Sequence, residues 1–151
     1  MPAHFAKYDS KHKAEPLFNI VADVEKYPEF LPWIAATRII ERGDNYFIAD
    51  MVAKFGSFTH KYTSRVEMIR PDAQNPDHKI KVGLVRGPFK YLKTDWLFIP
   101  KDTGTEIVFE LDFRFESAIF EKMIGFLFEK AVMRMTDAFM KRADELLHEN
   151  N

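Results

Sequence analysis

A helical segment of about thirty residues, beginning near Ser117, constrains the fold of this chain more than any other feature. One approximate stripe recurs along it at helical spacing: Phe120, Ile124, Leu127, Ala131, Met135, Ala138, Arg142 and Leu146. The first half is apolar nearly all round, since it also contains Ile119, Met123, Phe126, Phe128 and Met133. Such a helix needs cover over most of its circumference, and a sheet that curls around it supplies that cover.

Residues 34–116 contain the strands that can form this sheet, divided by turn signals at residues 43–45, 56–57, 71–77 and 102–104. In the last strand, polar residues alternate for the most part with Ile107, Phe109, Leu111, Phe113 and Phe115. In the strand that follows residues 56–57, one face carries Phe58, His60, Tyr62, Ser64, Val66 and Met68. One-sided alternation is typical of antiparallel sheets that have solvent on one face. We therefore predict about six antiparallel strands here.

Shorter elements come first along the chain. Residues 3–11 predict a weak strand, and residues 14–24 predict a helix with Leu17, Phe18 and Val21 on one side. Pro28 and Pro32 limit residues 25–33 to a short helical turn. The whole order predicts one α+β domain over residues 1–151. Its curved antiparallel sheet of about seven strands wraps the long C-terminal helix in a helix-grip arrangement.

Aromatic residues dominate the predicted interior, and Phe alone occurs 15 times. These rings can pack together as an ordinary core, or they can line a cavity, because a strongly curved sheet encloses more volume than one helix fills. The residues predicted to line such a cavity are Met51, Phe55, Tyr62, Val66, Leu84, Trp96, Phe98, Phe109, Phe113, Met123, Leu127 and Met135.

Charge and composition exclude several classes of protein. The 22 basic and 23 acidic residues nearly cancel and form no basic block, which argues against bulk capture of DNA. The absence of Cys excludes disulfides and thiol catalysis. No His pair has the spacing of a metal site, so no metal is predicted. The first ten residues lack the apolar core of a secretory signal, and no apolar run is long enough to span a bilayer.

The sequence offers few groups for acid–base catalysis. His60 is predicted on the inner face of its strand, whereas Asp95, Glu110 and Asp112 are predicted to face outward. An inward His without a nameable partner is explained by a hydrogen-bonded pocket residue as well as by a catalyst. We therefore expect no catalytic residues and no enzymatic activity.

Two segments carry a resemblance to a known family: Val24-Glu25-Lys26-Tyr27-Pro28-Glu29-Phe30-Leu31-Pro32-Trp33, and Gly87-Pro88-Phe89-Lys90-Tyr91-Leu92 leading to Trp96 and Phe98. They resemble the coenzyme Q-binding branch of the START-like superfamily. That superfamily also includes RatA-type proteins and proteins described as polyketide cyclase/dehydrase. The likeness extends over essentially the whole chain, although Ile34 stands where relatives often have Cys.

The resemblance implies a non-catalytic protein that binds ubiquinone in its cavity and supports respiration as a carrier or chaperone. RatA-type relatives are instead associated with blocking ribosomal subunit joining, and a cyclase-like enzyme using His60 or Tyr62 is a third alternative. No mitochondrial targeting extension is visible, so we expect a bacterial protein that acts in the cytoplasm and touches the inner membrane only peripherally.

The residues suggest surfaces for these alternatives. Phe30, Leu31 and Trp33 lie in a Pro-constrained loop beside charged residues, a mixture suited to a rim that docks on a membrane, although the same rings can also plug the core. A ribosome-binding face would need scattered basic residues to gather in three dimensions. The candidates are Lys54, Lys61, Arg65, Lys79, Lys81, Lys90 and Lys93.

Overall fold

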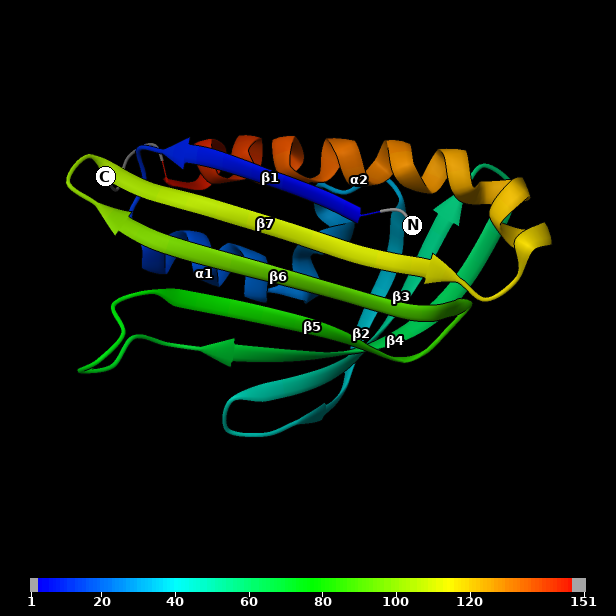
Figure 1. Ribbon diagram of the computed structural model, residues 1–151, viewed down its shortest axis with the longest axis horizontal. Helices are drawn as coiled ribbons and strands as arrows, with labels where there is room; N and C mark the ends of the chain where they lie inside the picture. Colours follow the sequence, from blue (N-terminus) through cyan, green and yellow to red (C-terminus); the bar gives the residue numbers. More distant parts are fainter. Residues whose placement is uncertain (1–2, 148–151) are drawn as a thin grey trace.

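Seven antiparallel strands form one sheet in the order β1-β7-β6-β5-β4-β3-β2 in the computed structural model, which describes residues 3–147 (Figure 1). The strands are β1 (Ala3–Ser10), β2 (Ile34–Arg42), β3 (Tyr46–Phe55), β4 (Phe58–Ile69), β5 (His78–Arg86), β6 (Phe89–Lys101) and β7 (Gly104–Phe115). The helices are α1 (Ala14–Ala22), the 3-10 helix η1 (Val24–Glu29) and α2 (Ala118–Leu147). The predicted helix-grip arrangement is confirmed.

The turns between strands lie where the sequence predicts them. The connection from β3 to β4 is the two-residue turn Gly56-Ser57, with Phe55 opposite Phe58 and a φ of 62° at Gly56. Glycine adopts that left-handed conformation without strain, which favours a tight hairpin. A second glycine, Gly104, has no room for a side chain, because a Cβ there would lie 2.0 Å from the carbonyl oxygen of Ser10. These hairpins fix the register of the central strands.

Both α-helices lie on the same side of the sheet, and α1 packs against β5, β6 and α2 (Figure 1). The core between them is built from rings of both layers. Trp96 of β6 stacks on Phe98 with centroids 6.1 Å apart and contacts Phe139 of α2 at 5.2 Å. Phe18 of α1 contacts Phe98 from the other side at 6.1 Å. This part of the interior is a packed core.

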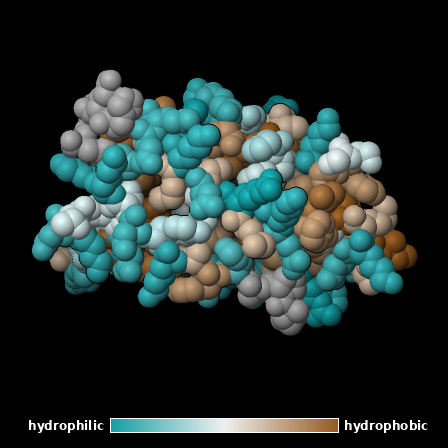
Figure 2. All heavy atoms as spheres, turned by 90° about the horizontal axis from the view of Figure 1, so that it is seen from above, coloured by the Kyte–Doolittle hydropathy of each residue, from teal (hydrophilic) through white to brown (hydrophobic). Residues whose placement is uncertain are grey.

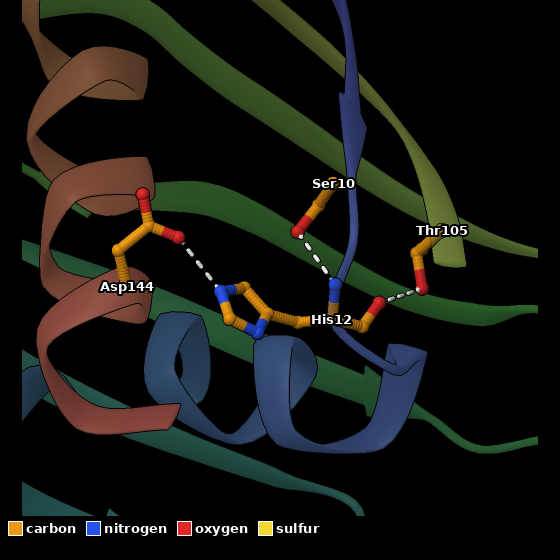
Figure 3. Close-up of polar contacts among 4 residues, drawn as sticks. All are labelled: Ser10, His12, Thr105 and Asp144. Atoms are coloured by element: carbon orange, nitrogen blue, oxygen red, sulfur yellow. Dashed lines mark hydrogen bonds and ion pairs between the residues drawn. The ribbon is translucent and has the colours of Figure 1, made fainter. Parts of the chain in front are cut away.

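Polar contacts hold the C-terminal half of α2 against the start of the chain (Figure 3). His12 follows β1 and is fully buried, and its Nε2 lies 2.7 Å from a carboxylate oxygen of Asp144. The backbone N–H of His12 donates to the Ser10 hydroxyl, and its carbonyl accepts from the Thr105 hydroxyl at 2.8 Å. Tyr8 of β1 also hydrogen-bonds Thr136 of α2. One end of the long helix is thereby fixed to the sheet.

The first half of α2 is less covered than its sequence predicts. Ile119 and Phe126 are 73% and 75% exposed, and Met123 and Met133 are also exposed. The reason is geometric: the first turns of α2 lie at the end of the sheet, where strands contact only one side of the helix (Figure 1). Figure 2 shows hydrophobic atoms gathered at the end of the molecule where α2 begins.

Candidate functional site

An apolar cavity of about 110 Å³ lies between the middle of α2 and the concave face of the sheet. Its walls come from α1, η1, β2 to β7 and α2. Ligand pockets commonly measure about 300–1,000 Å³, so this cavity is small. Met51 and Met135 are two of the lining residues, and their flexible side chains can move to enlarge it.

The structure brings together half of the residues predicted to line a cavity. Those in its wall are Met51, Phe55, Tyr62, Val66, Trp96 and Met135. Phe98, Phe109 and Phe113 are buried elsewhere in the packed core, and Leu84 is half-buried outside the cavity wall. Met123 and Leu127 do not face the interior, because this part of α2 turns them outward. Whether any of these residues contacts a ligand stays a prediction.

The three residues predicted to form a membrane-docking rim lie at different depths. Leu31 is 1% exposed and belongs to the core, so it cannot dock on a surface in this conformation. Phe30 and Trp33 are half-buried beside α2. The ring of Phe30 packs on Phe139 at 5.1 Å, while Trp33 lines the cavity wall. Core packing therefore accounts for Leu31 and for the ring of Phe30, while docking of this loop on a membrane stays a prediction.

Hydroxyl groups are the polar features of the cavity wall. Ser64 is fully buried and its Oγ has no hydrogen-bond partner among the described residues. The Tyr62 hydroxyl donates only to the sulfur of Met51, a weak acceptor, at 3.5 Å. Burial raises the pKa of Tyr62 to about 12. Both groups thus present hydroxyl donors to a ligand oxygen. Sequence reasoning placed Ser64 on the inner face but missed it as a site residue, because only the structure shows that it has no partner.

A second half-buried tyrosine, Tyr27 of η1, also lines the cavity. Its hydroxyl donates to the backbone carbonyl of Val21, and burial raises its pKa. Because that donor is occupied, Tyr27 supplies an aromatic wall and holds η1 against α1. The Tyr-Pro pair that carries part of the family resemblance therefore has a structural role here.

The acid–base candidates do not assemble into a catalytic group. His60 lies opposite Ala53, on the inner face as predicted, but at the exposed end of β4 with its ring 4.7 Å from Phe120. Asp95, Glu110 and Asp112 belong to the outer face, where Asp95 pairs in register with Glu110 and Lys93 with Asp112. No Asp, Glu, His, Lys or Arg lines the cavity among the residues that the structure describes. Residues 3–147 also contain no cluster of side chains that could hold a metal ion.

A groove of about 610 Å³ adjoins the cavity, between α2, the loop after η1 and the turn after β3. Trp33, Phe55 and Ala131 line both spaces, so they form the mouth of the cavity. Five basic residues line the groove: Lys54, Lys130, Arg134, Lys141 and Arg142. Two of them, Lys130 and Arg134, lie within one turn of Ala131 on α2. Arg142 donates to Glu29 at 2.6 Å, which holds the pKa of that carboxyl below its usual range.

The predicted basic face is divided by the fold. Lys54 lies at the groove, whereas Lys61, Arg65, Lys79, Lys81 and Lys93 point from β4, β5 and β6 to the outer face. There Lys81 stands between Glu67 and Asp95, and Lys93 lies opposite Asp112. Lys90 lies apart, at the start of β6. The outer face therefore mixes charges, and basic residues gather more clearly along the groove that adjoins the cavity mouth.

Known proteins resemble this chain over most of its length. The family described as polyketide cyclase / dehydrase and lipid transport matches residues 10–140. The ribosome association toxin RatA of Rickettsia prowazekii is 41% identical over 136 residues, which cover 90% of this chain and 92% of the relative. The mitochondrial coenzyme Q-binding protein COQ10 of Drosophila melanogaster is 26% identical over 86% of this chain and 53% of its own length. Of these two, the RatA protein is the more similar.

Solved structures agree with the fold. An 18 kDa protein from Caulobacter crescentus is 31% identical, with a TM-score of 0.72 over 97% of this chain and 98% of its own. A START superfamily protein from Mycobacterium smegmatis has a TM-score of 0.73 at 17% identity, over 95% and 98% of the two chains. The described residues include no helix long and apolar enough to cross a membrane. The family match and the helix-grip architecture agree: this chain belongs to the polyketide cyclase/dehydrase and lipid transport family.

Proposed function

We propose that this protein associates with the ribosome and restrains translation, acting by binding rather than by catalysis, in the cytoplasm of a bacterium. The observation that carries the proposal is the 41% identity to a ribosome association toxin across nearly the full length of both chains. This identity supports the RatA-type alternative from the sequence analysis more strongly than the expected function as a quinone carrier.

Exposed cations give such an association a physical basis, because ribosomal RNA presents a dense array of phosphates. The chain carries a net charge of only −1, so its basic residues must be concentrated locally to act on RNA. The cavity mouth and the outer face both expose lysines, and they differ in how many carboxylates lie among them. Either face is within reach of mutagenesis without disturbing the core.

Sedimentation through sucrose gradients tests the proposal. We expect the purified protein to cosediment with ribosomal subunits and to lower the yield of joined ribosomes, with binding that weakens as salt rises. Lys130→Gln with Arg134→Gln removes two charges at the mouth, and Lys81→Gln with Lys93→Gln removes two from the outer face. The pair that loses more binding identifies the contact face. Absence of the unaltered protein from every ribosomal fraction would exclude the proposal.

A second candidate is binding of a quinone-type ligand in the cavity, and the two hydroxyls of β4 favour it. Ser64 and Tyr62 lie two residues apart on the cavity wall and lack strong acceptors among the described residues. A carbonyl oxygen on an apolar ring would accept from both while the ring contacts Met51 and Trp96. The similarity to a coenzyme Q-binding protein supports this candidate at lower identity.

Organic extraction of the purified protein, followed by mass spectrometry, tests this candidate. Protein made in a quinone-producing host should yield a quinone, and Tyr62→Phe with Ser64→Ala should lower the yield several-fold. Thr59→Ala, an exposed change on the outer face of the same strand, is the matched control. Extracts free of quinone, or an equal loss in the control, would count against it.

A further inference from the structure

The mouth of the cavity combines an apolar entrance with exposed positive charges beside it. Neither association with a ribosome nor binding of a neutral quinone requires both properties. On the inside, Trp33, Phe55 and Ala131 lead into an apolar space. On the outside, Lys130 and Arg134 project from α2 on the groove side, one turn apart and both exposed. We propose that this mouth binds single anionic amphiphiles, with the apolar tail in the cavity and a phosphate or carboxylate head held by the basic residues.

The charges at the mouth favour an anion. Of the five basic residues of the groove that adjoins the mouth, only Arg142 forms an ion pair with another described residue, Glu29. Lys54, Lys130, Arg134 and Lys141 have no carboxylate within 4.0 Å in residues 3–147. Glu145 also borders the groove, so the surrounding positive charge is reduced but not cancelled. Charge-assisted hydrogen bonds to a phosphate or carboxylate would satisfy these donors.

The interior favours a tail rather than a second polar group. Apart from the hydroxyls of Tyr27, Tyr62, Ser64 and Thr94 and the indole N–H groups of two tryptophans, the side chains of the cavity wall are apolar, and burial of each CH₂ group there contributes about 0.8 kcal/mol. Because the cavity measures only about 110 Å³, a short alkyl chain fits it better than a long one unless the methionines move. The head then stays in the groove, where water and cations are available.

Among ligands with the same tail, the mouth should therefore select by head-group charge. This inference stands apart from ribosome association, which concerns a macromolecular partner. It also differs from quinone binding, in which the oxygen-bearing end of the ligand lies inside the cavity. The three can be separated by ligands that share one tail.

Isothermal titration calorimetry on the full chain provides the test, with octyl phosphate and 1-octanol as probes of equal tail length. We expect octyl phosphate to bind about tenfold more tightly than 1-octanol, the difference that one charge-assisted contact supplies. Lys130→Gln with Arg134→Gln should remove this preference and leave 1-octanol binding unchanged. The charge-matched control on the outer face, Lys81→Gln with Lys93→Gln, should retain the preference.

Other results would overturn the inference. Equal affinity for the two probes would show that the cations do not hold the head. If inorganic phosphate bound as tightly as octyl phosphate, the alkyl tail would contribute nothing, and the site would bind anions without involving the cavity. Binding to anionic lipid vesicles without binding to monomeric octyl phosphate would identify a membrane-docking surface instead. If the outer-face control lost the preference for octyl phosphate to the same extent, the preference would depend on the net charge of the protein and not on the groove.

Discussion

The two halves of α2, one continuous helix of 30 residues, both contribute buried residues but differ in what else they carry: long-range polar contacts in one and large exposed apolar side chains in the other. In the C-terminal half, Phe139 and Thr136 are fully buried, and Asp144 and Arg142 reach the rest of the fold through His12 and Glu29. In the N-terminal half, Ile119 and Phe126 are largely exposed, and the cavity mouth opens beside the middle of the helix.

This difference suggests that the two halves of α2 have different roles. Stability within a fold is not uniform, and segments with few buried contacts open at lower free energy than the core. The fixed half holds the sheet closed around its rings, while the less covered half borders the space in which a ligand would enter. The α2 residues that line the cavity begin only at Phe128, so a movement of α2 that enlarges the cavity would have to include its middle turns.

The largest expected difference comes from replacing one Phe by Ala in each half of α2. Phe139→Ala should destabilise the fold by about 3–5 kcal/mol, because Phe139 is 1% exposed and packs on Tyr27, Phe30 and Trp96. Phe126→Ala, at a 75% exposed position, should change the free energy of unfolding by less than about 0.5 kcal/mol. Urea unfolding monitored by circular dichroism measures both. Similar losses would mean that the two halves are equally buried in solution.

A smaller effect is expected at the polar anchor. Asp144→Ala removes the carboxylate that contacts the buried His12 ring and should cost about 1–2 kcal/mol, since a buried hydrogen-bonding group loses one partner. Asp137→Ala, an exposed carboxylate on the same helix, is the control and should be close to neutral. Equal values for the two variants would show that the anchor in Figure 3 does not fix the helix.

His78, at the start of β5 and against Phe18 of α1, should make the stability of the fold depend on pH. Burial lowers its pKa below the ordinary value of 6.5, with Arg70 acting in the same direction and Glu15 opposing. The folded protein therefore binds a proton less readily than the unfolded chain, and stability should fall as pH drops below about 6.5. His78→Phe should flatten this dependence, whereas the exposed His60→Gln should not. Unfolding midpoints between pH 7.5 and 5 provide the measurement, and an unchanged slope in His78→Phe would refute the assignment.

Sequence patterns predicted the fold well because strands and turns depend mainly on residues that are close together in the sequence. The alternation from Ile107 to Phe115 fixes one face of β7, and the turn residues at 56–57 and 102–104 fix the hairpins. The predicted cover over the first half of α2 is incomplete, because periodicity shows which residues are apolar and not how far the sheet extends beside them. Met123 and Leu127 were therefore predicted to line the cavity, although they lie on a part of α2 that is turned away from it.

The site was harder to predict than the fold, because it depends on contacts between distant elements. Lys54 and Lys130 are far apart in the sequence, yet they border one groove. Phe98 and Phe109 have the same inward pattern as Trp96, but α1 and β1 fill the space beside them, so that only Trp96 reaches the cavity. Nothing in the periodicity distinguishes a ring that packs from a ring that lines a space.

The smallest expected effect concerns Ser64, at the boundary between packed core and cavity. Its Oγ is buried without a hydrogen-bond partner among the described residues, so Ser64→Ala removes no hydrogen bond between those residues and should change stability by less than about 0.5 kcal/mol, or raise it slightly. Thr63→Ala is the matched control, because the neighbouring Thr63 hydroxyl donates to Asp50 at 2.5 Å and its loss should cost about 1 kcal/mol. The same unfolding experiment ranks the two. A larger cost at Ser64 than at Thr63 would show that its hydroxyl already serves the fold, and would remove it from the groups available to a ligand.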